Sequence, residues 1–286
     1  MILKKVAKAI VPRVMWDFVR ERREFFSDLF RNYGRAGGTL SYCGYRIRYT
    51  NGMTIVARVR REGVFERTLC EKIVRRLGGS SSSQPIFLDI GSNIGLISAY
   101  IASRVPAARI YAFDPGKLQY ELFSETLRIN GLQDRVELSD VAFGDHDGEE
   151  LYYVHDAREI SKDGFRDTRR GGATRSVSVR VERLDMWWHE MGRPDISAIK
   201  IDTEGAELLI LRGGEECITA VRPHIYLEIE PRNLKAYEYH PADILEWFVS
   251  HGYRLSSLHG TVCSDVSFLN QCIARGEDTY VGEPMN

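Results

Sequence analysis

The chain has 286 residues, and its 39 Lys and Arg against 40 Asp and Glu give a formal net charge of −1. With 43% hydrophobic and 28% charged residues, it has the composition of a folded globular protein, not of a disordered or collagen-like chain. The near-zero charge argues against a surface built wholly for nucleic acid. No apolar run approaches the roughly 18 residues that a membrane-spanning helix requires. The five scattered cysteines contain no CxxC pair, so neither a zinc knuckle nor a disulfide framework is indicated, and a cytoplasmic location is expected.

Residues 1–35 are expected to form a basic helical extension. They carry nine Lys or Arg against four Asp or Glu, and their Val, Phe and Leu residues recur at roughly helical spacing. Two interpretations stay open: the Phe stripe packs on the main domain, or the basic face docks on anionic lipid or on a phosphate-bearing acceptor. The second interpretation would place the protein at the periphery of the inner membrane face.

Residues 36–83 are expected to form a β-hairpin plus a helix that lead into the core. Alternating side chains between Gly37 and Arg60, with Asn51-Gly52 as the turn, favour the hairpin. The apolar spacing over Phe65 to Leu77 predicts the helix. Gly and Ser over 78–83 indicate a flexible connection.

From residue 84 to residue 275, short apolar strands alternate with amphipathic helices, and residues 276–286 are expected to be a tail. Strands are predicted at Ile86–Ile90, Arg109–Phe113, Val136–Ser139, Ala198–Ile201, His224–Glu228 and Tyr253–Leu258. Strict alternation of strands and helices requires parallel pairing, so the fold class is α/β with a doubly wound sheet. Because such sheets bind ligands beyond the carboxyl ends of their strands, the strand ends are where chemistry is expected.

The first two strand ends carry acids suited to a ligand. Asp89 precedes a G-x-x-x-G turn, Gly91 to Gly95, which lacks the middle glycine of a dinucleotide fingerprint and so disfavours a pyrophosphate there. The Asp89 carboxylate suits a cationic ligand group. Asp114 follows 25 residues later, close to the spacing of an acid that binds both hydroxyls of an adenosine ribose. The alternative for Asp114 is a cap of the next helix.

The later strand ends add more acids. If Asp114 binds the ribose, Asp140–Ala142 after the third strand would lie beside the adenine ring, with Asp140 either accepting from its amino group or serving as a turn residue. After the fourth strand, Asp202 and Glu204 favour a functional role. Glu207, in the first helical turn, favours a structural one because the helix dipole stabilises an anion there. The fifth strand adds Glu228, and Glu230 lies on the same face of it.

Six segments, in this order along the chain, resemble the FkbM family of S-adenosylmethionine-dependent methyltransferases. They are FLDIGSNIGLIS, IYAFDP, LRINGL, VAFGDHDG, IKIDTEGAELLILRGG and RPHIYLEIE. The resemblance covers about residues 63–260 and includes Gly63-Val64-Phe65-Glu66 before the core. It departs at Asp114, where such proteins commonly carry Glu, although the carboxylate is kept.

The resemblance implies a Rossmann-like methyltransferase sheet that binds S-adenosylmethionine. The methionine end would lie on the first strand end, the ribose on Asp114 and the adenine near Asp140–Ala142. The implied cofactor-binding residues are Asp89, Gly91, Ser92, Asn93, Gly95, Asp114, Pro115, Asp140, Val141 and Ala142. Family members mostly methylate hydroxyls of sugars or secondary metabolites, so this function is expected here.

The residues favour oxygen as the methyl acceptor. The turn after the fourth strand is Asp-Thr-Glu-Gly, not the [DNS]-P-P-[YFW] sequence of base amino methylation, and no cysteine nucleophile follows the strands. A sugar hydroxyl needs a base or a metal to lose its proton. We expect Asp202 or Glu204 as the base with Glu228 as helper, and a divalent cation on Asp202 and Glu204 is the rival interpretation.

Other functions of the site remain alternatives. They are a methyltransferase of an RNA 2′-hydroxyl or a protein, a non-catalytic S-adenosylmethionine-binding module, and, least favoured, a nicotinamide-dependent oxidoreductase. The loop Arg158–Arg175 carries six basic and three acidic residues, so it is either solvated or a lid over a phosphate- or carboxylate-bearing acceptor. His155, His240 and His259 are expected to be packing or surface residues.

Overall fold

The computed structural model describes residues 37–155, 160–169 and 174–285. The chain divides into two units, Met1–Gly38 and Thr39–Asn286. Only two residues of the first unit are described, so the helices predicted for residues 1–35 lie outside the described part of the chain. The second unit contains the central sheet and the helices that cover it.

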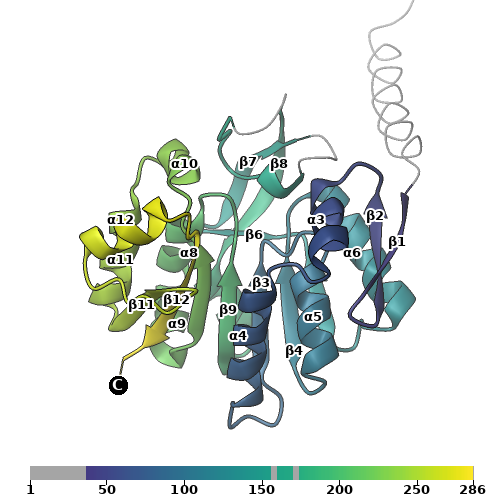
Figure 1. Cartoon of the computed structure of the whole chain (residues 1–286), viewed down its shortest axis with the longest axis horizontal. Helices are drawn as coiled ribbons and strands as arrows, with labels where there is room; N and C mark the ends of the chain where they lie inside the picture. The colour runs from purple at the N-terminus through teal and green to yellow at the C-terminus, as the bar shows by residue number, and fades with distance from the viewer. Residues whose placement is uncertain (1–36, 156–159, 170–173, 286) are drawn as a thin grey trace, which may run out of the picture. The chain divides into compact units, whose positions relative to one another are not determined.

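The centre of this unit is a seven-stranded sheet in the order β11-β12-β10-β9-β3-β4-β5 (Figure 1). β3 pairs in parallel with β4 on one side and with β9 on the other, so the chain winds outward in both directions from β3. This is the doubly wound arrangement that the sequence predicted, and its switch point lies between β3 and β9. The strands are β3 (Ile86–Ile90), β4 (Arg109–Phe113), β5 (Val136–Ser139), β9 (Ile196–Ile201), β10 (His224–Glu228), β11 (Tyr253–Ser257) and β12 (Thr279–Pro284).

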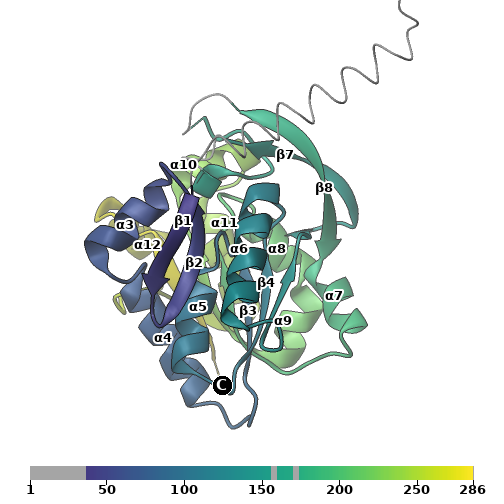
Figure 2. The same ribbon diagram turned by 90° about the vertical axis from the view of Figure 1, so that its right-hand side faces the viewer.

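Two hydrophobic cores flank the sheet, because successive strand residues point to opposite faces. Leu88 and Ile90 of β3 belong to one core, and Phe87 belongs to the other. Helices cover both faces (Figures 1 and 2). The Phe87 side packs against α3 (Thr54–Glu62), α4 (Arg67–Gly78), α5 (Leu96–Arg104) and α6 (Lys117–Asn130). The other side packs against α7 (Leu184–Glu190), α8 (Glu207–Gly213), α9 (Glu215–Val221), α11 (Pro241–Ser250) and α12 (Val266–Ala274).

The hairpin before the core is real, but its predicted position was wrong. It consists of β1 (Gly37–Tyr42) and β2 (Tyr45–Thr50), with its turn at Cys43-Gly44. Both turn residues have positive φ, 50° and 90°, as a tight two-residue hairpin requires. Asn51-Gly52 instead leads into α3, whose buried Ile55, Val56 and Val59 follow helical spacing. Because positions four apart share a face in both a strand and a helix, Ile55 and Val59 fitted either structure.

The C-terminal segment is not a tail. Residues 279–284 form β12, which pairs antiparallel with both β10 and β11 inside the sheet. A Cβ atom at Gly282 would lie 2.1 Å from the Phe248 ring, so only glycine lets α11 pack this closely on the strand. Gly282 and Pro284 in a six-residue strand are poor strand formers, which is why the sequence pattern did not predict it.

A second, three-stranded sheet follows β5 and was not predicted. It has the order β6-β8-β7 and stands beyond the carboxyl ends of the central strands (Figure 1). Its strands are β6 (Ala142–Gly144), β7 (Gly148–Val154) and β8 (Arg175–Arg183). The segment after β7 turns back over it through a bridge between Tyr153 and Gly164 and contains the short helix η1 (Ile160–Lys162). Much of the loop predicted over 158–175 is therefore attached to this sheet in the described residues.

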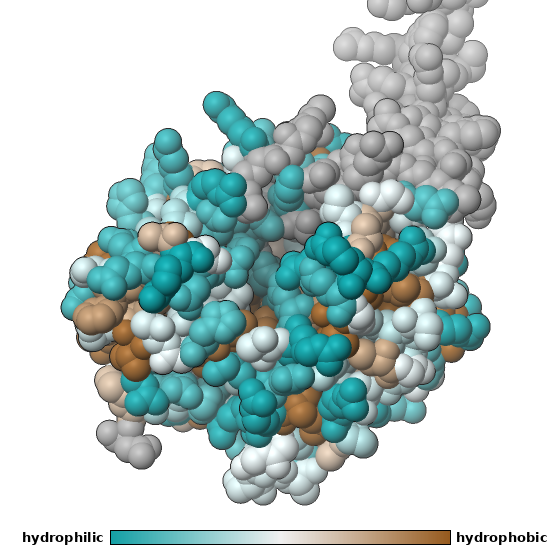
Figure 3. All heavy atoms as spheres, in the orientation of Figure 1, coloured by the Kyte–Doolittle hydropathy of each residue, from teal (hydrophilic) through white to brown (hydrophobic). Residues whose placement is uncertain are grey.

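The face drawn in Figure 3 is mostly hydrophilic, with small apolar groups. Exposed large apolar side chains include Val249 on α11 and Val266 and Phe268 on α12. Within the described residues, no helix combines the length and the apolar character needed to cross a membrane.

Candidate functional site

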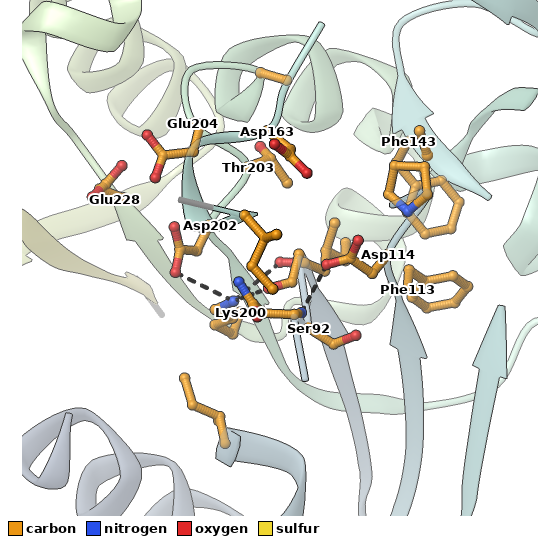
Figure 4. A pocket seen from close by; sticks show the side chains of 18 of the residues that line it. Ser92, Phe113, Asp114, Phe143, Asp163, Lys200, Asp202, Thr203, Glu204 and Glu228 are labelled. Atoms are coloured by element: carbon orange, nitrogen blue, oxygen red, sulfur yellow. Dashed lines mark hydrogen bonds and ion pairs between the residues drawn. The ribbon is translucent and has the colours of Figure 1, made fainter. Parts of the chain in front are cut away.

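A pocket opens at the switch point of the sheet, between the carboxyl ends of β3 and β9 (Figure 4). It encloses about 1040 Å³, counting the space that is open to solvent. The turn after β3, the end of β4, the start of β6 and the turn after β9 each contribute lining residues. Among the predicted site residues, those that line it are Gly91, Ser92, Asn93, Asp114, Pro115, Val141, Ala142, Asp202, Glu204 and Glu228.

Backbone hydrogen bonds fix the turn after β3 at the floor of the pocket. The amides of Gly91 and Ser92 both donate to the Phe113 carbonyl of β4, at 2.9 and 3.0 Å. Gly91 has φ 76°, and a Cβ atom there would lie 1.8 Å from the backbone oxygen of Asp202. Glycine is thus required where the ends of β3 and β9 approach each other.

Asp114 and Ser92 give this floor the character of a ligand site. The Asp114 carboxylate accepts the Asn93 amide at 2.8 Å and the Gly116 amide at 2.9 Å. Burial raises the pKa of Asp114 to about 7, although these two backbone donors lower it. The Ser92 hydroxyl is buried and has no hydrogen-bond partner within the described structure. Both groups retain capacity for the hydroxyls and amine of an adenosine-type cofactor, which therefore fits the residues present.

An apolar wall borders this end of the pocket. Val141, Ala142 and Phe143 line it, and the Phe113 and Phe143 rings lie 4.6 Å apart. Such a wall suits a flat aromatic ring. Asp140, by contrast, is exposed and does not line the pocket. It belongs to a turn in which the Val141 amide donates to the Ser139 hydroxyl, which agrees with the turn alternative, and a contact of Asp140 with the adenine amine stays a prediction.

Asp89 also lies elsewhere than predicted. It is fully buried behind the turn, where it accepts the Ser98 hydroxyl at 2.6 Å and pairs with the Lys200 ammonium at 3.5 Å. Its cationic partner in the described structure is therefore the Lys200 side chain. Gly95 likewise does not line the pocket. A Cβ atom there would lie 2.2 Å from the Phe123 ring, so glycine is needed for Phe123 to pack against this turn.

At the other end of the pocket, three carboxylates converge. Oxygen atoms of Asp202, Glu204 and Glu228 all lie within 4.8 Å of one another, a spacing that could hold a metal ion. The Asn233 amide donates to Glu204 at 2.7 Å and to Glu228 at 3.1 Å. Burial, together with the neighbouring charges of Asp202 and Glu204, holds the pKa of Glu228 well above its ordinary value. Proton uptake by Glu228 is therefore favoured over that of an isolated glutamate.

The turn that carries two of these acids is held from below. Glu207 is buried and accepts the Thr203 amide at 3.0 Å, the Thr203 hydroxyl at 3.1 Å and the Gly205 amide at 3.3 Å. Its role in the described structure is to shape the turn, as expected. Glu230, predicted to share a strand face with Glu228, instead lies beyond the end of β10, where it pairs with Arg232, and it is not a lining residue.

Three groups at the pocket were not singled out from the sequence. Glu66, noted only through the family resemblance, lines the pocket beside Arg58, and burial and Asp202 raise its pKa to about 7. Lys200 ties the ends of β3 and β9 together. Asp163, within the charged loop, is buried and lines the pocket. In the sequence, the only hint of a role for Asp163 was its position close to His155.

The fold and the pocket define a class of protein: a Rossmann-like α/β protein with a pocket at the switch point of its sheet. The FkbM methyltransferase domain matches residues 89–255 of the chain, which is more than half of it. The chain belongs to this family.

Several named proteins are similar to the chain. Methyltransferase sdnD of Sordaria araneosa is 32% identical over 161 residues, which is 47% of this chain and 62% of sdnD. The 2-O-methyltransferase NoeI of Sinorhizobium fredii is 29% identical over 189 residues, covering 60% of this chain and 75% of NoeI. The chain spans only 11% of the AMB antimetabolite synthetase AmbE of Pseudomonas aeruginosa, at 26% identity. The crystal structure of methyltransferase FkbM from Methylobacillus flagellatus is also similar, with a TM-score of 0.46 and 15% sequence identity. The aligned region is 71% of this chain and 44% of the crystallised chain.

Proposed function

We propose that the chain transfers a methyl group from S-adenosylmethionine to a hydroxyl of a sugar or secondary metabolite. The observation that carries this proposal is the convergence of Asp202, Glu204 and Glu228 at one end of a pocket whose other end suits an adenosine. The name of the relative NoeI, a 2-O-methyltransferase, supports oxygen as the acceptor atom. The location is proposed to be cytoplasmic, with the basic residues 1–35 as the element that could reach a membrane surface.

The acids would remove the proton that makes a hydroxyl a poor nucleophile. S-Adenosylmethionine, when bound, supplies a methyl group on a positively charged sulfur. As the acceptor oxygen forms its bond to the methyl carbon, the carbon–sulfur bond breaks and its electron pair stays on sulfur. The hydroxyl proton goes to a carboxylate, Asp202 or Glu204, with Glu228 close enough to share it. Alignment of oxygen and methyl by the pocket walls supplies much of the acceleration.

The charge at this end of the pocket bears on the acceptor. Glu66, Asp202, Glu204 and Glu228 all line it, and the nearby Lys200 is already paired with Asp89 and Asp202. This surrounding favours a group that donates hydrogen bonds, such as a polyhydroxyl ring, at the reacting position. A phosphate or carboxylate of the acceptor would then be bound away from these acids.

The test is methyl transfer from isotopically labelled S-adenosylmethionine to a panel of sugars, nucleotide sugars and hydroxylated metabolites. We expect an O-methyl product, with the rate reduced about 100-fold or more in Asp202→Asn, the size of effect typical for a lost general base. Asp145→Asn, an exposed acid outside the pocket, is the matched control and should keep the wild-type rate. Product methylated on nitrogen or carbon, or an Asp202→Asn rate close to wild type in the presence of chelator, would overturn the proposed chemistry.

The same assay separates a base from a metal. If Asp202, Glu204 and Glu228 would hold a divalent cation, chelation should abolish transfer and added Mg²⁺ or Mn²⁺ should restore it. Transfer that is unaffected by chelator but lost in Asp202→Asn assigns these acids to proton removal.

A further inference from the structure

We infer that Asp163 is a second carboxylate of the cofactor site and that it binds, together with Asp114, the cis-diol of the cofactor ribose. This inference rests on the proposed use of S-adenosylmethionine and extends it to a residue from the inserted segment after β7. Asp163 lies outside the strand-end turns that usually supply such residues.

Asp163 lies in the same pocket as Asp114. Asp163 and Asp114 both line the pocket, and Figure 4 shows both carboxylates at the same cavity. The two acids are close enough that the charge on Asp163 contributes to the raised pKa of Asp114. Two buried carboxylates that face one cavity repel each other unless hydrogen-bond donors come between them.

Asp163 is held in place by residues that lie behind it, away from the pocket. Its Oδ1 accepts the His155 amide at 2.7 Å and lies 3.2 Å from Nδ1 of the His155 ring. Its Oδ2 accepts the Gln119 amide of α6 at 2.7 Å. The side chains of His155 and Asp163 are each 1% exposed, so the carboxylate cannot turn out to solvent. A buried acid fixed by three donors is oriented before any ligand arrives.

The two carboxylates keep hydrogen-bond acceptor positions that no protein group in the described residues uses. A carboxylate offers about four lone-pair positions. Asp114 uses one on each oxygen for the amides of Asn93 and Gly116, and Asp163 uses two on Oδ1 and one on Oδ2. About one position stays open on each of three oxygens around the cavity. A ribose diol brings two donors, which these oxygens can accept from both sides.

The anchoring of Asp163 also connects the inserted segment with the Asp114 turn. Gln119 donates to the Ile160 carbonyl at 3.0 Å as well as to Asp163. A Cβ atom at Gly116 would lie 2.3 Å from the Gln119 amide oxygen, so glycine is needed for Gln119 to reach across. The turn that holds Asp114 and the segment that holds Asp163 therefore meet at one side chain.

The experiment measures binding of S-adenosylhomocysteine to the full chain by isothermal titration calorimetry, so that no acceptor is needed. We expect Asp163→Asn to weaken binding about 10- to 100-fold, the loss typical for one charge-assisted hydrogen bond. Asp167→Asn is the matched control. Asp167 lies four residues along the same segment and accepts the Arg169 amide and the Thr174 hydroxyl, but it does not line the pocket. It should bind as wild type does.

A pair of probes assigns the contact to the diol. Wild type should prefer adenosine over 2′,3′-dideoxyadenosine, and Asp163→Asn should lose about 10-fold of that preference. Equal binding of S-adenosylhomocysteine by Asp163→Asn and wild type, or a loss that is the same for both adenosines, overturns the inference. If Asp163→Asn does not fold, Asp163→Glu keeps the charge but moves the oxygens by one methylene, and the same two criteria apply.

The outcomes also separate this inference from the proposed function. A wild-type chain that fails to bind S-adenosylhomocysteine contradicts the proposed cofactor. A wild-type chain that binds it, with Asp163→Asn unchanged, contradicts only the role of Asp163.

Discussion

Asp114 couples the pocket to pH at the scale of a single residue. Its pKa is raised to about 7 by burial and by Asp163, while Lys200 and the amides of Asn93 and Gly116 lower it. The neutral form therefore prevails in the empty pocket below that pH. A ribose diol donates hydrogen bonds and so favours the ionised form. Cofactor affinity should then be full above pH 7 and decline as the pH falls through it.

We predict that adenosine affinity falls by up to about tenfold per pH unit below pH 7, the limit for linkage to one proton. Adenosine suits the measurement because none of its groups titrates near neutrality. Asp114→Asn should bind more weakly at every pH and show a flat profile between pH 6 and 8. Equal slopes in wild type and Asp114→Asn would assign the proton to another group, with Glu66 the first candidate because its pKa is also about 7.

Lys200 connects the carboxyl ends of the two central strands, β3 and β9. Its ammonium donates to the Gly91 carbonyl at 2.7 Å and lies 3.5 Å from Asp89 and 3.4 Å from Asp202. Burial alone would lower its pKa, but the surrounding acids raise it. Removing the ammonium would leave Asp89 fully buried without a counter-charge.

We predict that Lys200→Met lowers the free energy of unfolding by about 3–5 kcal/mol, the cost of breaking a buried ion pair from one side. The double variant Lys200→Met with Asp89→Asn removes both charges and should recover more than half of that loss. Urea unfolding followed by circular dichroism gives both values. A single variant as stable as wild type, or a double variant no better than the single, would show that the pair does not carry this energy.

At the scale of elements, the hairpin is fastened to α6 by side chains that replace a strand partner. The Asn130 amide oxygen accepts the Arg46 amide at 2.9 Å, and its nitrogen donates to the Arg46 carbonyl at 2.8 Å. The Thr126 hydroxyl accepts the Arg48 amide at 2.9 Å. Figure 2 shows β2 running alongside α6 as these bonds require.

We predict that Asn130→Ala costs about 1–2 kcal/mol of stability, the sum of two ordinary hydrogen bonds at an exposed site. Amide hydrogen exchange should accelerate at residues 46 and 48 and stay unchanged in the central strands. Asn51→Ala, in the exposed turn after β2, serves as the control with little effect. Unchanged exchange at residue 46 in Asn130→Ala would mean that the hairpin is held by its apolar contacts alone.

The helices and strands that could be predicted share one property: the side-chain pattern within the segment itself is enough to identify them. The buried strands β3, β4 and β9 are short apolar runs that end in an acid or a glycine, and so they were found within a residue or two. The hairpin turn was misplaced because Cys43-Gly44 carries no familiar turn signal, whereas Asn51-Gly52 does. β12 and the β6-β8-β7 sheet depend on pairing partners far along the chain, which local pattern does not reveal.

The site residues also divide into those that local pattern predicts and those that depend on long-range contacts. Asp114, Asp202, Glu204 and Glu228 come at or directly after the ends of predicted strands, so the topology rule brings them to one pocket. Asp89 was misassigned because its partner Lys200 lies 111 residues away in sequence but on the adjacent strand. Asp163 was missed because it reaches the pocket through a segment folded back by the Tyr153–Gly164 bridge. Both depend on contacts that only the tertiary structure defines.

At the scale of the whole molecule, the last strand completes a sheet that the rest of the chain leaves open. β12 is inserted between β10 and β11, and its Tyr280 is fully buried. The Ile229 amide, just beyond β10, donates to the Asp278 carbonyl, and so the strand also borders the pocket end that carries Glu228. The region that matches the FkbM family ends at residue 255, so the strand that connects β10 with β11 lies beyond it.

We predict that truncation after Asp278 prevents stable folding, although it leaves the family-matched region intact. The unpaired edges of β10 and β11 and the uncovered Phe248 ring would promote association between chains. The loss should exceed about 4 kcal/mol, because it combines lost strand pairing with exposure of a core. Soluble yield and the thermal midpoint measure this, and truncation after Pro284 provides the control that keeps β12 whole. A truncated chain with wild-type yield and midpoint would show that β11 can pair with β10 directly, which would make β12 an accessory to the fold.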